Sequence, residues 1–369
     1  LTAIAGSILN TYDNFAYPAV TPVILNLTLI ISVLFFVPYF DEPVFALAWG
    51  LLIGGVIQLI FQVYPIIKLG LFPKIKFNSK HPGIKKIKEI MLPMIFGSSV
   101  TQINMIFDTV IASFLITGSI GWLYMSDRFV ELPLALFGIS IATVLLPKLS
   151  EYYNESDDDS YNKTLNWGFK LAILISFPTM LGLILLSDPI LITLLNYKEF
   201  SSNDVYMTSI ALIAFSLGLP GMIGAKILIT NYYSRKDTRY PVNAALKAVI
   251  CNFILNITFV VILVNTNFNG AHIGLALATS ISAYVNFFFL LSTAVKTKIF
   301  SIDKNTIMIL LKSMAATFVM SIFILFFDLS KKTWMNYSLT DRVGNLFLLI
   351  ISASIIYFAM LYLFNIKLQ

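Results

Sequence analysis

Charged residues are scarce in this chain of 369 residues: only 12% are charged, whereas 58% are hydrophobic. A soluble globular domain usually carries about 25% charged residues. Folded in water, a chain of this length would form roughly two domains, each with a polar surface. The sequence has too few polar residues to cover such surfaces, so we expect most of the outside of the protein to face lipid.

Cysteine and histidine are also scarce. Cys251 has no second cysteine with which to form a disulfide, and only His81 and His272 are available for a metal site or a nucleophile pair. Glycine-rich phosphate loops, nucleophile elbows and zinc motifs are missing as well. We therefore expect no enzyme activity, no catalytic residue and no organic cofactor. The net charge of +6 does not indicate nucleic-acid binding, because the basic residues lie between hydrophobic runs.

Long hydrophobic runs are what the sequence has in abundance. A helix needs about 20 residues to cross a hydrocarbon core of about 30 Å. The runs predict an all-α, polytopic membrane protein with an N-terminal helix fragment and ten complete transmembrane helices. The fragment covers 1–10, and the ten helices cover 18–38, 44–67, 89–116, 119–147, 169–195, 206–232, 241–264, 272–295, 307–328 and 343–366. The chain begins at Leu1 without a signal-peptide pattern, and we expect its true N-terminus to lie upstream.

The distribution of lysine and arginine predicts the orientation. Most basic residues fall in alternate connections, such as 68–88, 148–170, 235–247 and 296–312, and we expect the acidic run 151–159 in one of these loops. Basic loops remain on the cytoplasmic side of a membrane. We therefore place these connections and the C-terminus in the cytoplasm. The opposite connections hold only Lys198, Lys331, Lys332 and Arg342.

A few charges fall inside predicted spans, where a charge is costly and usually functional. Arg128 and Glu131 are three residues apart and share a helix face, with Asp127 beside them. We expect these three residues to belong to a substrate site, where the arginine would hold an anionic substrate; alternatively, the pair only neutralises itself. Lys226 follows a break in another span, at Gly218-Leu219-Pro220-Gly221. It would either face a substrate cavity or extend to the membrane interface.

A second group of polar residues predicts a cation site. Asp108 lies deep in the span 89–116, Asn252 and Asn256 are four residues apart on another span, and Thr279 lies on the next. A carboxylate with amide and hydroxyl oxygens suits a hard cation, and sodium is the ion we expect. The alternative is that these residues only join helices by hydrogen bonds.

Many residues together resemble the MurJ (MviN) family of lipid II flippases, over essentially the whole chain. The segment from Ala112 to Ser150 carries the most specific matches. Its matching residues are Ala112-Ser113-Phe114-Leu115, Gly118-Ser119, Trp122-Leu123-Tyr124, Asp127-Arg128, Glu131-Leu132-Pro133, Gly138 and Thr143-Val144-Leu145-Leu146-Pro147-Lys148-Leu149-Ser150. Further matches are Ala48-Trp49-Gly50, Asn166-Trp167-Gly168, Lys226 and Asp237-Thr238.

This resemblance implies a bacterial inner-membrane transporter of the MOP exporter superfamily, with fourteen helices. Two lobes of six helices would flank a cationic cavity, and two additional helices would form a groove. The chain would then begin near the end of the fourth helix. Residues 1–84 would complete the first lobe and its linker, 85–300 would form the second lobe, and 301–369 would form the additional helices.

The resemblance also implies the substrate and partners. Lipid II, a peptidoglycan precursor linked to undecaprenyl pyrophosphate, would cross from the inner to the outer leaflet, with its pyrophosphate on Arg128 and its tail in the groove. Membrane lipids and cell-wall synthesis proteins are the other expected partners. Two alternatives remain at this point: another MOP-type exporter, for drugs or lipid-linked oligosaccharides, and a truncated scaffold that transports nothing.

Overall fold

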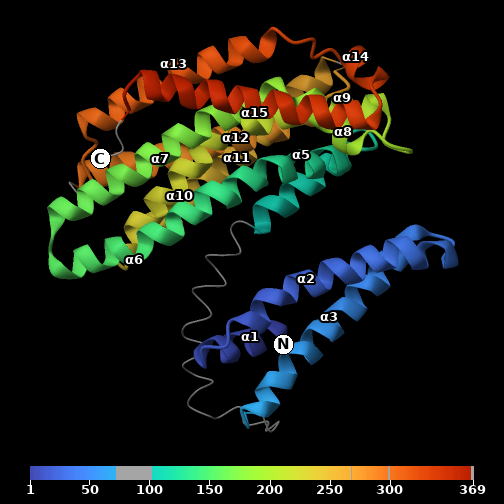
Figure 1. Ribbon diagram of the computed structural model, residues 1–369, viewed down its shortest axis with the longest axis horizontal. Helices are drawn as coiled ribbons and strands as arrows, with labels where there is room; N and C mark the ends of the chain where they lie inside the picture. Colours follow the sequence, from blue (N-terminus) through green and yellow to red (C-terminus); the bar gives the residue numbers. More distant parts are fainter. Residues whose placement is uncertain (72–101, 267, 298–299, 367–369) are drawn as a thin grey trace. The chain divides into compact units, whose positions relative to one another are not determined.

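The computed structural model describes residues 1–71, 102–266, 268–297 and 300–366. The chain divides into two compact units, Leu1–Lys88 and Glu89–Gln369. Every regular element in the described ranges is a helix (Figure 1). The expected boundary at residue 84 falls among residues that are not described.

The first unit is a helical hairpin with a short helix beside it. α1 (Thr2–Thr11) precedes α2 (Ala16–Ile31), which continues through the π-helix η1 (Ser32–Phe36) and the 3₁₀-helix η2 (Val37–Tyr39) and returns as α3 (Pro43–Lys68). Two glutamines of α3 join it to α2. Gln58 donates to the carbonyl of Thr21 at 2.8 Å, and Gln62 donates to the Thr21 hydroxyl at 2.6 Å. These bonds connect polar groups that lipid could not satisfy.

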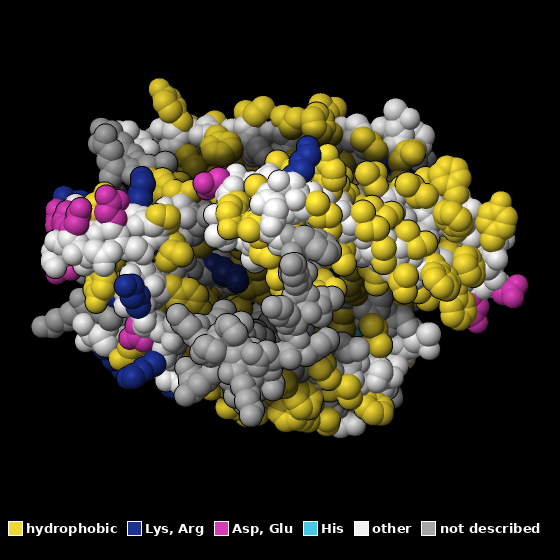
Figure 2. Space-filling view, turned by 90° about the horizontal axis from the view of Figure 1, so that it is seen from below, with side chains coloured by type: hydrophobic (Ala, Val, Ile, Leu, Met, Phe, Trp, Pro, Cys, Tyr) yellow, Lys and Arg dark blue, Asp and Glu magenta, His cyan; other side chains and the backbone are white. Residues whose placement is uncertain are grey.

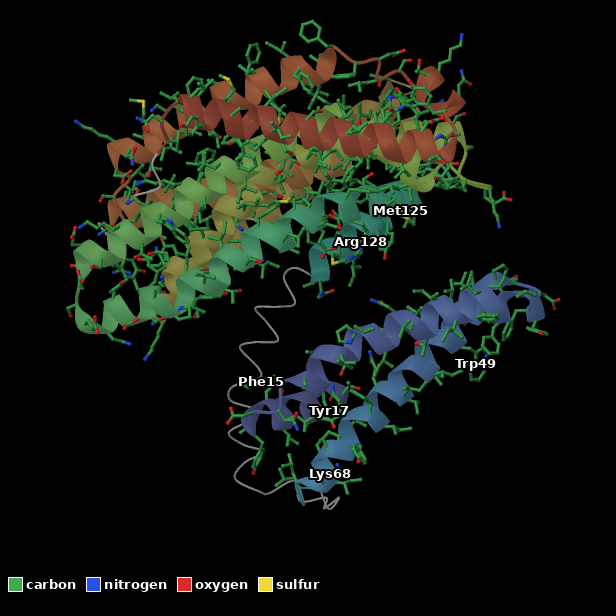
Figure 3. All side chains as sticks on the ribbon, viewed as in Figure 1. Phe15, Tyr17, Trp49, Lys68, Met125 and Arg128 are labelled. Carbon is green, nitrogen blue, oxygen red and sulfur yellow. The ribbon has the colours of Figure 1, made fainter. Side chains whose placement is uncertain are left out.

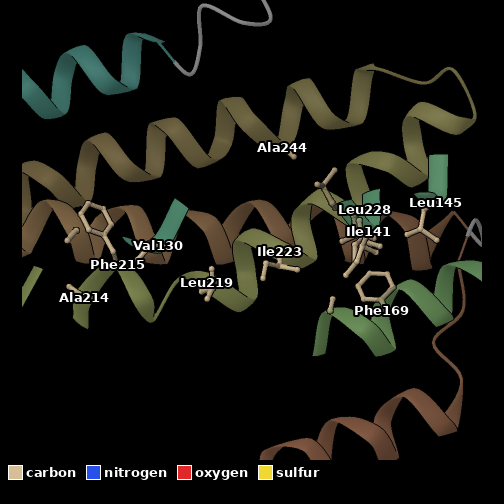
Figure 4. Packing of buried hydrophobic residues seen from close by; sticks show 14 of the residues in the cluster. Val130, Ile141, Leu145, Phe169, Ala214, Phe215, Leu219, Ile223, Leu228 and Ala244 are labelled. Carbon is tan, nitrogen blue, oxygen red and sulfur yellow. The ribbon is translucent and has the colours of Figure 1, made fainter. Parts of the chain in front are cut away.

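The second unit contains the remaining helices. Residues 102–113 are helical, and one long bent helix follows, made of α5 (Ser119–Pro133), the π-helix η3 (Leu134–Ile139) and α6 (Ser140–Glu155). The other helices are α7 (Asp158–Leu185), α8 (Ser187–Leu195), α9 (Ser202–Ser216), α10 (Leu219–Ser234), α11 (Arg239–Asn265), α12 (Ile273–Lys296), α13 (Lys304–Leu325), α14 (Lys331–Asn336) and α15 (Leu339–Leu363). Their shared core includes Leu145, Phe169, Leu219 and Ile223 (Figure 4).

The described helices fit a membrane protein. Eight are long and apolar enough to cross a bilayer, and the pair α9 and α10, bent by 43°, brings the total to as many as nine. Each predicted span other than 89–116 overlaps one of these helices or the bent pair, but the span predicted at 169–195 is divided between α7 and the separate helix α8. Residues 89–101 of the span 89–116 lie outside the described ranges. Hydrophobic side chains cover much of the visible surface in Figure 2.

The prediction of a loop at 148–170 is wrong. α6 continues to Glu155 and α7 begins at Asp158, so Lys148, Lys163 and most of the acidic run lie on helices. Asp157 begins α7 by accepting a hydrogen bond from the backbone N–H of Ser160, a standard N-cap contact. Hydropathy marks only the part of a helix inside the bilayer, so it misses such polar extensions.

The bend between α9 and α10 is held by α12. Ser280 donates to the carbonyl of Ala214 at 2.6 Å, and Tyr284 donates to the carbonyl of Leu217 at 2.8 Å. A Cβ added at Gly218 would lie 2.7 Å from the Cα of Ser280, so glycine is what lets α10 approach α12 this closely. These hydroxyl groups satisfy the carbonyls that the break exposes.

The last helices pack against α7. Pro178 has no N–H, which leaves the carbonyl of Leu174 without its helical partner. Tyr357 of α15 donates to that carbonyl at 2.7 Å, and its hydroxyl also contacts Ser313 of α13 at 2.9 Å. One tyrosine therefore connects α7, α13 and α15.

Candidate functional site

Charged side chains near the middle of α5 form the first part of the site. An Nη atom of Arg128 lies 2.6 Å from a carboxylate oxygen of Glu131, and the guanidinium lies 4.7 Å from the centre of the Tyr124 ring. The side chains of Arg128 and Glu131 are 49% and 54% exposed, so both can be reached from outside the unit. Figure 3 shows Arg128 on α5, one turn from Met125.

The contacts of Arg128 leave most of its hydrogen-bonding capacity unused. Glu131 takes one of its nitrogens, and no other hydrogen bond from Arg128 is present among the described residues. A guanidinium offers five N–H groups in a plane, and two of them match two oxygens of a phosphate. The predicted ion pair is present, and the remaining N–H groups are sufficient for an anionic ligand.

Lys226, also predicted to bind substrate, lies on α10 with its side chain exposed. No ion pair or ring contact of Lys226 is present in the parts of the chain that the structure describes. The structure places it on a different helix from Arg128 and shows no contact between the two. Its predicted role stays a prediction.

The structure brings the four predicted cation ligands into one hydrogen-bonded chain. The side-chain nitrogen of Asn256 donates to Asp108 at 2.6 Å and to Asn252 at 2.8 Å. Asn252 in turn donates to the hydroxyl of Thr279 at 3.2 Å. The second carboxylate oxygen of Asp108 accepts from Asn104 at 3.1 Å. Residues from three helical segments therefore converge at one point inside the second unit.

One oxygen of this cluster lacks a partner. The side-chain oxygen of Asn256 is buried and accepts no hydrogen bond. Its nitrogen lies between the oxygens of Asp108 and Asn252, which is where a cation would neutralise the carboxylate. Rotating the Asn256 amide by half a turn would direct its oxygen to that point. Asp127 is also near enough to Asp108 for the two carboxylates to repel each other, which a cation would relieve.

An apolar groove of about 660 Å³ forms the third feature of the site. α7, α13 and α15 supply most of its walls, and Phe137 of η3 also lines it. This volume lies within the range of about 300–1,000 Å³ that is usual for small-molecule sites. Its lining residues are almost entirely hydrophobic, and the hydroxyl groups of Thr179, Ser354, Tyr357 and Tyr362 are the exceptions. The groove suits a hydrocarbon chain.

Polar contacts that the sequence did not predict hold the start of α13 against α7, beside this groove. Lys170 of α7 was predicted in a loop, but its side chain is only 5% exposed and lies 3.1 Å from Asp303, the N-cap of α13. Asn166, one turn earlier, donates to the carbonyl of Ser301 at 2.9 Å. The sequence indicates these contacts only through the spacing of Asn166 and Lys170, which are four residues apart at the end of an apolar run. No spacing rule identifies their partner more than 130 residues away.

The environment of Asp303 favours its charged form. Partial burial alone would raise the pKa of this carboxyl group. Hydrogen bonds from Thr306 and the nearby ammonium of Lys170 outweigh that effect, so the pKa of Asp303 lies below its usual range. The carboxylate is therefore ionised at neutral pH, where it stabilises the start of α13.

Comparison with known proteins identifies the family. The family model described as "Lipid II flippase MurJ" matches residues 1–344. The chain belongs to the MurJ family. A probable lipid II flippase MurJ from Vibrio cholerae serotype O1 is 38% identical over 367 residues, which cover all of this chain and 69% of that protein. The corresponding protein from Haemophilus influenzae is 36% identical over 371 residues, covering 99% of this chain and 71% of the relative.

A solved structure agrees with the MurJ assignment. "Lipid II flippase MurJ, inward closed conformation" matches with a TM-score of 0.80 and 30% sequence identity, over 98% of this chain and 70% of that one. The predicted fold class is confirmed: the protein is a multi-pass protein of the bacterial inner membrane, and its described residues form helices alone. The number of spans differs, because eight or nine are present in the described ranges and ten were predicted. The MurJ family consists of transporters and not of enzymes, and the two alternative functions are not favoured.

Proposed function

We propose that this protein is a flippase that moves lipid II from the inner to the outer leaflet of the bacterial inner membrane. The observation that carries the proposal is the presence, within one MurJ-family unit, of an accessible arginine on a membrane helix and an apolar groove. Lipid II combines an anionic pyrophosphate with a long hydrocarbon tail. These two features of the protein match its two chemically different ends.

The head of the substrate would bind at Arg128. Two pyrophosphate oxygens would accept hydrogen bonds from the N–H groups that Glu131 leaves unused. Asp127 and Glu131 would limit how tightly the site holds an anion, because their negative charges repel it, and this would favour release on the other side. Lys226 would add a second positive charge on α10. The tail would remain in the groove of α7, α13 and α15.

Transport of this kind needs a driving force but no covalent chemistry. Sodium at Asp108, Asn252, Asn256 and Thr279 is the coupling ion that we propose, because the carboxylate of Asp108 lies there and half a turn of the Asn256 amide would bring an unpartnered buried oxygen to it. Asp108 also lies near Asp127, the neighbour of Arg128. Sodium binding would therefore change the charge close to the head site.

The orientation in the membrane follows the positive-inside rule. The α10–α11 turn carries Arg235 and Lys236, and Arg239 begins α11. This turn would face the cytoplasm together with the C-terminus. Contacts with cell-wall synthesis proteins stay a prediction.

Translocation by the purified chain tests the function. The chain would be reconstituted into vesicles that contain fluorescent lipid II, with the Vibrio cholerae relative as a positive control. A reagent that destroys the fluorophore only in the outer leaflet reports the rate of movement. We expect movement of lipid II faster than in protein-free vesicles. A chain that inserts and folds but leaves this rate unchanged, beside an active relative, would contradict the proposal.

A further inference from the structure

The groove cannot choose its occupant by hydrophobicity. It would exchange one hydrocarbon chain for another, because the surrounding lipid tails are as apolar as the groove itself. The hydrophobic effect arises when apolar surface leaves water, and a tail that moves from the bilayer into the groove does not leave water. Any preference for one tail must come from shape, through the number of close contacts between tail and wall.

Gly182 determines the shape of one wall. It lies on α7, lines the groove, and has no atom within 4 Å of the position that a Cβ would occupy. Bulkier groove residues lie on either side of it, with Ile175 on α7 and Leu186 directly after the end of α7. On α15, Ala353 and Ser354 also present small side chains to the groove. The wall of the groove therefore carries no side chain at Gly182 and faces open space there.

Neither packing nor backbone geometry requires glycine at this position. No atom of a neighbouring helix in the described ranges lies within 4 Å of the position that its Cβ would take, and its φ is not in the left-handed region. Glycine in a helix interior costs about 1 kcal/mol relative to alanine. Three other helical glycines, Gly55, Gly121 and Gly344, also face open space, but none of them lines the groove. Gly182 is thus distinguished by its location and not by its conformation.

The tail of lipid II differs in shape from the chains around it. A polyprenyl chain carries a methyl branch and a double bond in every five-carbon unit, whereas an ordinary acyl chain is straight and mostly saturated. The polyprenyl chain is wider, and its double bonds leave fewer conformations to be lost on binding. A widened groove gains contacts from the branches that a straight chain cannot make.

We infer that Gly182 is a specificity-determining residue, which widens the groove so that it selects a methyl-branched polyprenyl tail over straight acyl chains. The inference rests on the proposed function, because that function supplies the tail. It assigns to Gly182 a role at the tail and none at the pyrophosphate, which Arg128 would hold. Head and tail recognition are therefore separable by mutation.

The test compares two tails on one head group. Lipid II with its undecaprenyl tail and an analogue with a straight saturated tail are reconstituted separately into vesicles of phosphatidylethanolamine and phosphatidylglycerol. For the unsubstituted protein we expect the polyprenyl form to move at least about tenfold faster, the scale on which an apolar pocket discriminates shape. Gly182→Leu should bring this ratio close to one. Gly344→Leu, which adds the same side chain outside the groove, should leave the ratio unchanged.

A second variant and a binding measurement keep the result interpretable. Ser354→Leu narrows the groove from α15 and should lower the ratio in the same direction. Thermal stabilisation of the detergent-solubilised protein by undecaprenyl pyrophosphate and by a straight-chain pyrophosphate gives tail selectivity without transport. A Gly182→Leu protein that unfolds at the temperature of Gly344→Leu and keeps the selectivity of the unsubstituted protein in both assays would overturn the inference. The unsubstituted protein could also move no lipid II, while Gly182→Leu still abolishes tail selectivity in the thermal assay. That result would contradict the proposed function and leave the role of Gly182 in tail selection intact.

Discussion

Replacing Arg128 distinguishes substrate binding from simple charge balance with Glu131. A hydrogen bond to a charged group contributes about 1.5–3 kcal/mol, so Arg128→Ala should slow translocation by about 10- to 150-fold. Arg128→Lys should also be slow, because an ammonium group cannot form the planar pair of bonds. Lys148→Gln, which removes an exposed cation on α6, is the control. Normal transport by a double variant, Arg128→Gln with Glu131→Gln, would show that the two residues only neutralise each other and do not bind the substrate.

Replacing Asn256 tests whether the cluster around Asp108 binds sodium. Binding to the folded state alone stabilises a protein by about 1.4 kcal/mol when the ligand is present at ten times its Kd. We therefore expect a higher unfolding temperature in sodium chloride than in potassium chloride at equal ionic strength. Asn256→Leu should remove the difference, whereas Thr258→Val, two residues along α11, should preserve it. Equal unfolding temperatures of the unsubstituted protein in both salts would argue against a sodium site.

At the scale of helices, the charge on Asp303 should make the attachment of α13 depend on pH. Because the pKa of Asp303 is lowered by folding, its stabilising effect is present above the ordinary value of 3.8 and is lost as the pH falls through the lower folded value. Asp303→Asn should therefore lower the unfolding temperature at pH 7 by about 2 °C or more. The difference from the unsubstituted protein should shrink below about pH 4. A difference that stays constant from pH 7 to pH 3 would show that the charge has no part in it.

Tyr357 tests how α15 is attached to α7. Tyr357→Phe removes the donor to the Leu174 carbonyl, which Pro178 leaves without a helical partner. Hydrogen bonds between membrane helices average about 0.6 kcal/mol and reach about 1.7 kcal/mol, and we expect a loss toward the upper value because the carbonyl becomes unsatisfied. Tyr362→Phe on the same helix, with a side chain that is 86% exposed, should change stability little. Equal losses of stability in the two variants would show that the hydrogen bond from Tyr357 to the Leu174 carbonyl does not attach α15 to α7.

Hydropathy and charge predicted where the helices lie in the sequence far better than which helices contact each other. The spans and the chain of contacts from Asp108 to Thr279 follow from residue type and helical spacing, because each depends on one helix face at a time. Lys170 was misplaced, since only the fold shows that a carboxylate at Asp303 makes its burial tolerable. Gly182 gave no signal at all. An open space beside a glycine exists only after three helices have packed.

For the molecule as a whole, orientation is the property to test. Single cysteines at Lys236 and Asn269, in a Cys251→Ser background, would be labelled with a membrane-impermeant thiol reagent in intact cells. Lys236 lies in the α10–α11 turn and Asn269 in the α11–α12 connection, at opposite ends of α11. We expect labelling of the Asn269 position only, and of both positions once the membrane is permeabilised. Labelling of the Lys236 position in intact cells would reverse the topology.

The bond between Tyr357 and the Leu174 carbonyl also has a consequence for biosynthesis. Its two residues are 183 positions apart in the chain, and ribosomes add about 5–20 residues per second. The Leu174 carbonyl of α7 is therefore synthesised about 10–40 s before Tyr357, its hydrogen-bond donor. During that interval another donor, such as water or a neighbouring chain, must serve the exposed carbonyl. The groove is then among the last parts of the protein to assemble, and the nascent protein holds no tail until synthesis is nearly complete.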